Sequence, residues 1–361
     1  MKRAGMGILF LLLFFPSKEQ DKQLVLLATH RVGRVEVFDP VTLAPIGSIH
    51  VLPLANGIGS NPDGRILYIP EGIGPDFKGC CALYALNLET RRMTRLVEPS
   101  GGVTVSPDGN HVLTQRGNAG IEVYDGRTFE REAPVPRSVA PGVYDLYYSP
   151  DGHLLFGATN WPQPSLDIFD FASRQLVRRY PVSGDALLGA WVRDSFYLYS
   201  YHRSDGQLWK VNSQNATLGR PLKVSFSDAA PECEIHDEKM FGVGNRIFLY
   251  EAFGDKGDRR SGCKAPIPGG VLSMDPETGE VLRRLANGVH FNSLVPNSDG
   301  KELYGIDVRH LNWDSIGLVR LDTETGRVLS KKELTPDVWF IDLVSMPRNI
   351  VPHGELEAVH D

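Results

Sequence analysis

The sequence carries none of the short motifs that mark common enzyme classes. It has no Gly-x-Ser-x-Gly nucleophile elbow, no phosphate-binding P-loop, no Cys/His spacing of a zinc site and no Cys-x-x-Cys-His for haem attachment. These absences exclude the usual signatures of serine hydrolases of the α/β fold, nucleotide hydrolases, zinc-finger proteins and c-type cytochromes. We therefore assign no catalytic residue, no resident metal and no cofactor.

Basic charge is scarce. The 38 Lys and Arg residues are outnumbered by 44 Asp and Glu residues, which gives a formal net charge of −6. Nucleic-acid-binding surfaces need a basic patch or stripe, and none is visible along the chain. We expect no nucleic-acid partner.

Long apolar runs are missing beyond the first 20 residues. Lys2 and Arg3 precede the apolar run Gly5–Phe15, and the polar segment Pro16–Gln20 follows. A basic start and a short apolar run are typical of a secretory signal, because the run is too short to span a bilayer comfortably. We predict that residues 1–20 are a signal peptide with an uncertain cleavage site, and that the protein is exported to the periplasm or secreted. The mature chain should contain no membrane span.

A repeated pair of residues is the most informative feature that is present. Seven times, an Asp or Asn is followed three residues later by Thr, Ser or Asn, at the end of a short run with alternating apolar residues. The seven pairs are Asp39/Thr42, Asn87/Thr90, Asp125/Thr128, Asp170/Ser173, Asn212/Asn215, Asp275/Thr278 and Asp322/Thr325. Successive pairs begin 48, 38, 45, 42, 63 and 47 residues apart. A spacing in this range indicates a stack of similar supersecondary units.

Each unit is predicted to contain four short antiparallel strands. In the clearest copy, residues 111–114 and 121–124 form two strands, the Asp125/Thr128 turn follows, and residues 144–148 form the strand that ends in Ser149-Pro150-Asp151-Gly152. This tetrapeptide enforces a tight turn, since Pro fixes φ, Asp bonds its own backbone and Gly accepts a positive φ. Four short strands repeated without helical periodicity are typical of propeller blades.

The two ends of the repeat region complement each other. Leu24–Thr29, Arg34–Asp39 and Ala44–Ile49 supply three strands without an inner strand, whereas Val338–Ser345 is an inner strand without partners. Together they make one blade, which would close the ring and remove its exposed edges. We predict an all-β, seven-bladed β-propeller over residues 21–350, closed by three N-terminal strands and one C-terminal strand, with a tail over 351–361.

The arrangement strand, Asp-x-x-Thr turn, strand and Ser-Pro-Asp-Gly turn resembles the YVTN-type propeller repeat. The resemblance covers essentially residues 24–349 and extends, more remotely, to quinoprotein amine dehydrogenase heavy chains and lactonase-type propellers. It implies a WD40-like propeller fold without implying one activity, since such proteins include surface-layer, scaffold and enzyme subunits. Two turns depart from the pattern, at Arg193-Asp194-Ser195 and Gly244-Asn245-Arg246, and we expect less regular blades there.

The strand order sorts every connection onto one of two faces. The Asp-x-x-Thr and Ser-Pro-Asp-Gly turns share one face, the turn side, and the other connections share the opposite face, the loop side. The long insertions, which are the usual carriers of binding function, all fall on the loop side. They are Pro70–Ala82, Thr159–Ser165, Ser225–Glu238, Glu251–Gly270 and Val308–Ile316.

All four cysteines fall in these insertions. Cys233 and Cys263 both lie at the loop side of one blade, so a disulfide between them is the natural pairing in an oxidising compartment. Cys80 and Cys81 are then left as a vicinal disulfide or as free thiols. We interpret the cysteines as structural, because no activating base for a thiol nucleophile is evident nearby.

Ligand-binding candidates gather where the inner strands reach the loop side. Alignment of these strands places Asp145, Lys239 and Asp342 at one level, close enough for a charged cluster that orients a ligand or satisfies itself. Residues on the same rim could join them: His236, His290, Asn292 and Arg309, together with Trp161, Trp313 and Trp339. The acidic loop around His236 could chelate a divalent ion, but a solvated loop is the commoner explanation.

Three functions remain open. The first is an exported, non-catalytic propeller whose loop side binds a protein or a small ligand. The second is an enzyme or enzyme subunit, either a lactonase-type hydrolase with a His/Arg/carboxylate cluster or an amine-dehydrogenase-like heavy chain whose partner subunit carries the cofactor. The third is a structural module without a specific ligand.

Overall fold

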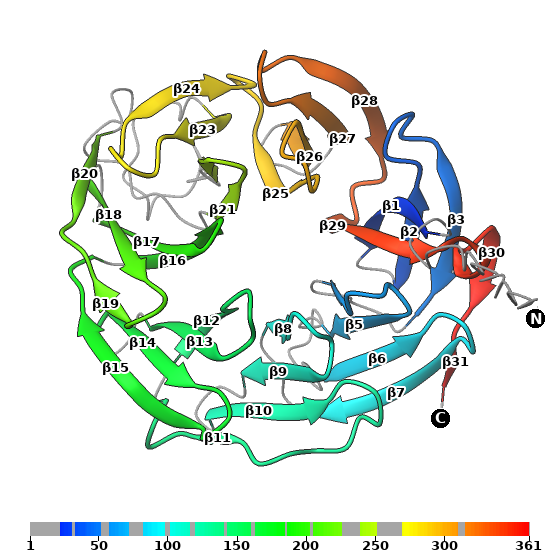
Figure 1. Cartoon of the computed structure of the whole chain (residues 1–361). Coiled ribbons are helices and arrows are strands. Elements are labelled where there is room, and N and C mark those ends of the chain that lie inside the picture. Colours follow the sequence, from blue (N-terminus) through cyan, green and yellow to red (C-terminus); the bar gives the residue numbers. More distant parts are fainter. Residues whose placement is uncertain are drawn as a thin grey trace, which may run out of the picture.

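The computed structural model is a closed ring of seven β-sheets around a central axis (Figure 1). The structure describes residues 22–30, 33–51, 58–71, 82–97, 102–115, 120–140, 143–159, 163–184, 186–202, 205–225, 239–250, 269–309 and 315–360. Each sheet contains four antiparallel strands, and three sheets carry additions. In six sheets the four strands follow chain order from the axis outward, and in the seventh a strand from the end of the chain is innermost. This confirms the seven-bladed propeller predicted from the sequence.

The blades are numbered here in the order in which the chain passes through them. Blade 1 contains β29 (Val338–Pro347), β1 (Lys22–His30), β2 (Arg34–Phe38) and β3 (Pro45–His50). Blade 2 contains β4 (Gly59–Ser60), β5 (Ile66–Pro70), β6 (Leu83–Asn87) and β7 (Arg92–Val97). Blade 3 contains β8 (Val103–Val105), β9 (His111–Gln115), β10 (Gly120–Asp125) and β11 (Val135–Pro136). Blade 4 contains β12 (Val143–Tyr148), β13 (Leu154–Thr159), β14 (Ser165–Asp170) and β15 (Gln175–Pro181).

The remaining blades follow the same plan. Blade 5 contains β16 (Ala186–Val192), β17 (Ser195–His202), β18 (Asp205–Asn212), β19 (Thr217–Leu218) and β20 (Leu222–Ser225). Blade 6 contains β21 (Lys239–Val243), β22 (Arg246–Tyr250), β23 (Val271–Met274) and β24 (Val281–Leu285). Blade 7 contains β25 (Phe291–Pro296), β26 (Glu302–Arg309), β27 (Ser315–Asp322) and β28 (Val328–Leu334).

Blade 1 closes the ring as the sequence predicts. The inner strand β29 pairs antiparallel with β1, from Lys22 opposite Pro347 to His30 opposite Val338. A strand from the end of the chain therefore completes a sheet begun by its first three strands, and no blade is left with an open inner edge. The pairing between β1 and β29 is called the closure seam below.

The seven Asp/Asn pairs form the predicted turns at the ends of the third strands. In the first, Oδ1 of Asp39 accepts hydrogen bonds from the amide of Thr42 at 2.7 Å and from its hydroxyl at 2.8 Å. An amide three residues on donates to the Asp or Asn side chain in every pair. These bonds satisfy polar backbone groups within the turn itself, so the turn needs little support from the rest of the fold.

The residue after each pair adopts a left-handed backbone conformation, which the sequence analysis did not foresee. The φ angle is positive at all seven positions: Leu43, Arg91, Phe129, Arg174, Ala216, Gly279 and Gly326. Five of these are not glycine, although a side chain in this conformation is strained. The hydrogen bonds of the turn thus outweigh the free-energy cost of the left-handed backbone at this residue.

The predicted Pro-Asp-Gly turns are also present, with φ values of 73° at Gly64, 72° at Gly109 and 74° at Gly152. The two departures from this motif are tighter turns. Val192 pairs with Ser195, and Val243 pairs with Arg246, so two residues complete each connection. Irregularity in blade 5 lies instead in its outer strand, which is split into β19 and β20.

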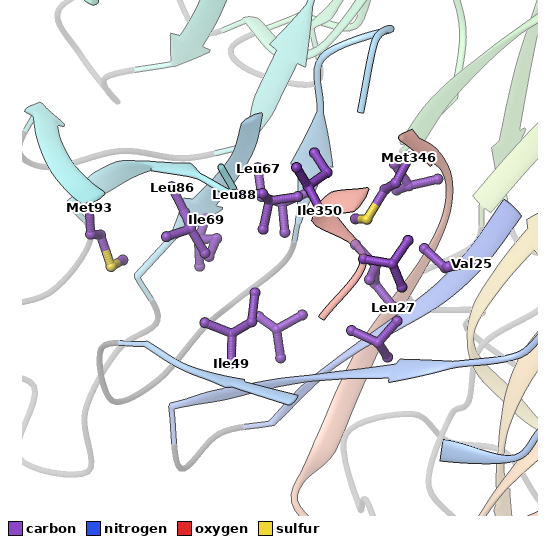
Figure 2. Packing of buried hydrophobic residues seen from close by; sticks show 14 residues of the cluster. Val25, Leu27, Ile49, Leu67, Ile69, Leu86, Leu88, Met93, Met346 and Ile350 are labelled. Carbon is purple, nitrogen blue, oxygen red and sulfur yellow. The ribbon is translucent and has the colours of Figure 1, made fainter. Parts of the chain in front are cut away.

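The core is divided among the interfaces between blades. Along β1, Leu26 and Ala28 face blade 7, whereas Val25 and Leu27 face blade 2, because successive side chains of a strand point to opposite faces. Figure 2 shows the cluster between blades 1 and 2, where Val25 and Leu27 lie near Met346 and Ile350. A corresponding cluster lies at each of the other six interfaces. Both faces of every blade are therefore buried.

Beyond β29 the chain forms a short 3-10 helix, η3 (Arg348–Ile350), and two further strands, β30 (Gly354–Glu357) and β31 (Val359–His360). The segment that the sequence analysis set apart as a tail thus adds strands to the outside of the ring. Within the described ranges, no helix has the length and apolar character needed to cross a bilayer.

Candidate binding site on the loop side of the ring axis

Lys239 interacts with residues of two other blades across the loop side of the ring. Lys239 begins the inner strand of blade 6, Asp145 lies on the inner strand of blade 4, and Phe340 lies on the inner strand of blade 1. Nζ of Lys239 lies 5.5 Å from the centre of the Phe340 ring, within the range of a cation–π contact. The charge of Lys239 also acts on the carboxyl of Asp145. We call Asp145, Lys239 and Phe340 the axial cluster.

The electrostatics of Asp145 reflect its position facing the axis. Asp145 as a residue is exposed to solvent, although neighbouring protein groups surround its carboxyl on several sides. This partial removal from water raises the pKa of its carboxyl, and the positive charge of Lys239 opposes the rise. The residue is therefore accessible to a ligand, and burial of its carboxyl is the cause of the raised pKa.

Asp342 lies two residues beyond Phe340 on the same strand. Burial raises the pKa of its carboxyl to about 7, and the amide of Leu343, which donates to its Oδ1 at 2.9 Å, lowers it. Within the described ranges, no charged group interacts with Asp342. Lys239 therefore acts on Asp145, and a charged cluster of Asp145, Lys239 and Asp342 stays a prediction.

His290 and Asn292 lie at the start of the inner strand of blade 7. The carbonyl of His290 accepts a hydrogen bond from the amide of Val308 at 2.7 Å. The carbonyl of Asn292 accepts one from the Tyr250 hydroxyl at 3.5 Å. These contacts involve their backbones, and whether the side chains bind a ligand stays a prediction.

Several predicted site residues lie outside what the structure describes. His236 is one of them, and so is the side chain of Arg309, although the Arg309 backbone pairs with Ser315. The four cysteines also lie outside the described residues, and so do Trp161, Trp313 and the side chain of Trp339. The two disulfides and the His/Arg/carboxylate cluster remain predictions. No group of three or more His, Cys, Asp or Glu side chains is placed to hold a metal ion in the described ranges.

A buried histidine at the closure seam is a feature that the sequence analysis missed. His30 ends β1 on the loop side, and its side chain has no exposed surface. Its Nε2 lies 3.0 Å from Glu36, and its Nδ1 lies 3.2 Å from Asp337, which precedes β29. Because Asp337 is 307 residues away along the chain, no local signal could have indicated this contact.

A shallow polar depression of about 410 Å³ lies on the opposite, turn side of blade 5. Asp194, Lys210, Ser213 and Thr217 are among its lining residues. Much of the lining is already hydrogen-bonded internally: Ser213 donates to the Asp194 carbonyl at 2.8 Å, and Thr217 donates to Asn215 at 2.6 Å. Since these groups are engaged with one another, we regard the depression as a consequence of the split outer strand.

Comparisons with solved structures agree on the fold. A functionally unknown protein from Desulfotomaculum acetoxidans DSM 771 is similar with a TM-score of 0.62 and 11% identity, over 89% of this chain and 98% of that one. The dihydro-heme d1 dehydrogenase NirN in complex with DHE is similar with a TM-score of 0.57 and 15% identity, over 91% of this chain and 76% of that one. AztD from Citrobacter koseri is similar with a TM-score of 0.54 and 13% identity, over 88% of this chain and 83% of that one. At this level of identity the likeness shows the fold alone. No protein-family model matches the sequence, and no curated protein is significantly similar to it.

Proposed function

We propose that this protein is an exported, non-catalytic propeller that binds a partner protein or a small ligand on the loop side of its axis. The axial cluster is the observation that supports this most directly. An ammonium from blade 6 interacts there with a phenyl ring of blade 1 and a carboxyl of blade 4. Exposed groups of different chemistry held on rigid strands are suited to recognition.

Export is part of the proposal. It is supported by the basic residues Lys2 and Arg3 before the apolar run Gly5–Phe15. A fusion of residues 1–25 to alkaline phosphatase, an enzyme that needs disulfides, should become active in a bacterial host. An inactive fusion whose product stays in the cytoplasm would contradict export and leave the binding proposal standing.

Binding is tested with the full chain and two matched substitutions. Tagged wild type, Lys239→Met and Arg127→Met are used to capture proteins and small molecules from native extracts of the source cells. Arg127 lies in the Asp125 turn, so it controls for loss of a positive charge on the opposite face. We expect at least one bound species to fall by about tenfold with Lys239→Met and to be unchanged with Arg127→Met. Equal recovery with all three proteins would rule out the axial cluster as the site.

The enzyme hypothesis is the second candidate, because the carboxyl of Asp342 has a pKa of about 7. A carboxyl that titrates near neutral pH can act as a general acid or base. One similar structure is also that of a dehydrogenase. This candidate predicts lactone hydrolysis that Asp342→Asn abolishes, or co-purification of a small, cysteine-rich subunit. A purified chain with neither property supports the binding role.

A further inference from the structure

The C-terminal segment leaves the ring and covers the outer edges of two neighbouring blades. After η3, strand β30 pairs in parallel with β3, the outer strand of blade 1, from Gly47 opposite Gly354 to His50 opposite Glu357. Strand β31 then pairs in parallel with β7, the outer strand of blade 2. Figure 1 shows both strands on the perimeter of the ring, beside the end of the chain. One segment of extended backbone thus joins two sheets from outside.

The edge of β3 is shaped to receive this backbone. A Cβ atom on Gly47 would lie 2.5 Å from the carbonyl oxygen of Pro352 and 2.7 Å from that of Gly354, so the close approach requires glycine. Ile350 and Val351 are buried in the cluster between blades 1 and 2. Further along, the amide of Ala358 donates to the His50 carbonyl at 3.0 Å.

Beyond Pro352 the segment is held mainly through its backbone. Leu356 and Ala358 are half-buried against the same cluster, whereas Glu355 and Glu357 point to solvent. The amide of Val359 donates to the Arg91 carbonyl at 2.8 Å. Two half-buried side chains contribute little apolar burial, so this part of the segment can open at a modest free-energy cost. Opening exposes the unpaired edges of β3 and β7, and such edges bind extended peptides.

The register indicates what kind of peptide fits. The exposed acidic side chains Glu355 and Glu357 lie on β30 beside β3, and the exposed bases Arg92 and Arg95 lie on β7 beside β31. A copy of the segment from a second molecule offers the same backbone, the same apolar side chains and the same charges. Exchange between two copies therefore preserves every contact, and only the hinge between β29 and β30 has to change.

We propose that the outer edges of β3 and β7 form a peptide-binding site that accepts residues 351–360 of a second copy of this chain. In a single molecule the chain's own segment fills the site. The occupant is an extended peptide with apolar side chains at the positions of Leu356 and Ala358 and with acidic side chains between and beside them.

The test uses full-length chains and a labelled synthetic peptide of residues 351–361. The variant Leu356→Lys/Ala358→Lys weakens docking of the chain's own segment but leaves the receiving edges intact. Its affinity for the peptide, measured by fluorescence anisotropy, should exceed that of wild type by about tenfold, because no internal segment competes. A peptide with the same two lysine substitutions should not bind.

Two further measurements complete the test. Gly47→Val should abolish peptide binding while the far-ultraviolet circular dichroism stays that of wild type. If Gly47→Val does not fold, the proposal is tested by the binding of the wild-type peptide and of the lysine-substituted peptide to the Leu356→Lys/Ala358→Lys chain. Wild-type chains with two different tags should co-purify after incubation at high concentration, and chains carrying Leu356→Lys/Ala358→Lys should not. Equal affinity of the peptide for wild type and variant, or equal binding of both peptides, would overturn the proposal.

Discussion

Nδ1 of His30 lies 3.2 Å from Oδ2 of Asp337, so the end of the first strand is tied to the start of the last inner strand. The other ring nitrogen faces Glu36 at 3.0 Å. The two ring nitrogens of His30 therefore join Glu36 on β2 to Asp337 before β29. This buried, hydrogen-bonded clamp ties the two strands of the closure seam at their loop-side end.

Substitution of His30 should weaken the seam. His30→Gln cannot reproduce both contacts of the buried imidazole ring, and the loss of a hydrogen bond to a charged group costs about 1.5–3 kcal/mol. Urea denaturation should show this loss in the free energy of unfolding. The exposed His153 is the control, since His153→Gln should change the stability by less than about 0.5 kcal/mol. Equal effects of the two substitutions would show that the clamp contributes nothing.

The same clamp predicts instability in acid. The hydrogen bond from His30 holds the pKa of Glu36 below its ordinary value of 4.5. Burial raises the pKa of Asp337, but hydrogen bonds from Thr335 and His30 outweigh it and leave the pKa lowered. A lowered pKa in the folded state stabilises the fold above the unfolded pKa, and this contribution is lost as the pH falls through the folded value. The melting temperature should thus fall steadily below about pH 4.5.

Glu36→Gln isolates this contribution. The variant should be less stable than wild type at pH 7, and the difference should shrink as the pH falls through the lowered pKa of Glu36, where the wild-type carboxyl also becomes protonated. Thermal melts at several pH values measure the difference. A difference that does not depend on pH would contradict the role of the Glu36 charge.

Asp342 predicts a pH dependence of the opposite sign. Burial raises the pKa of its carboxyl to about 7, so the folded state disfavours the charged form, and stability is lost as the pH rises through that value. Asp342→Asn should stabilise the protein at pH 9 by about 1–2 kcal/mol, a figure reduced for the partial exposure of the group. Below about pH 4, where the unfolded chain also binds the proton, the difference should largely disappear. The exposed Glu324 supplies the control, because Glu324→Gln should show no such trend.

The left-handed residues after the Asp/Asn turns offer a test of backbone strain. Arg91 is exposed and has a φ of 60°, so Arg91→Gly relieves strain that exceeds the added entropy of the unfolded chain. The stability should rise by up to about 1 kcal/mol in urea denaturation. The matched control is Arg92→Gly in the adjoining strand, which should destabilise. A loss of stability with Arg91→Gly would show that the turn already accommodates the side chain without strain.

The sequence predicted the fold well because the turns are encoded locally. Asp39 and Thr42 are three residues apart and bond each other directly, so repetition of the pair reveals the blades without long-range information. The left-handed conformation of Leu43 gave no such signal, since glycine replaces that residue in only some copies. The C-terminal strands were missed because β30 and β31 are short and carry exposed acidic side chains.

The candidate site was predicted only in part, for a geometric reason. The sequence indicates a shared level for Asp145 and Lys239, and the charge of Lys239 does act on Asp145. Phe340 gave no signal, because its contact with Lys239 joins two blades that are far apart in the chain. A β-bulge shifts the register of blade 4 between Val143 and Asp145, and another shifts blade 7 between Phe291 and Ser293. Neither bulge lies on the strands of Lys239 and Asp342, but each shifts the side chains of its own strand along the axis, and counting back from the turns cannot detect it.

The paired ends of the closure seam also determine how the ring responds to a mechanical load. Lys22 is the first residue of β1, and it lies opposite Pro347, the last residue of β29. A pulling force on the chain before Lys22 and after His360 would first strip β31 and β30 from the perimeter. It would then reach the Lys22/Pro347 pair and open β1 from β29 one hydrogen bond at a time, because both strands are held from the same end. Under tension, blade 1 would therefore yield by unzipping, while the blades formed from consecutive strands carry the load only afterwards.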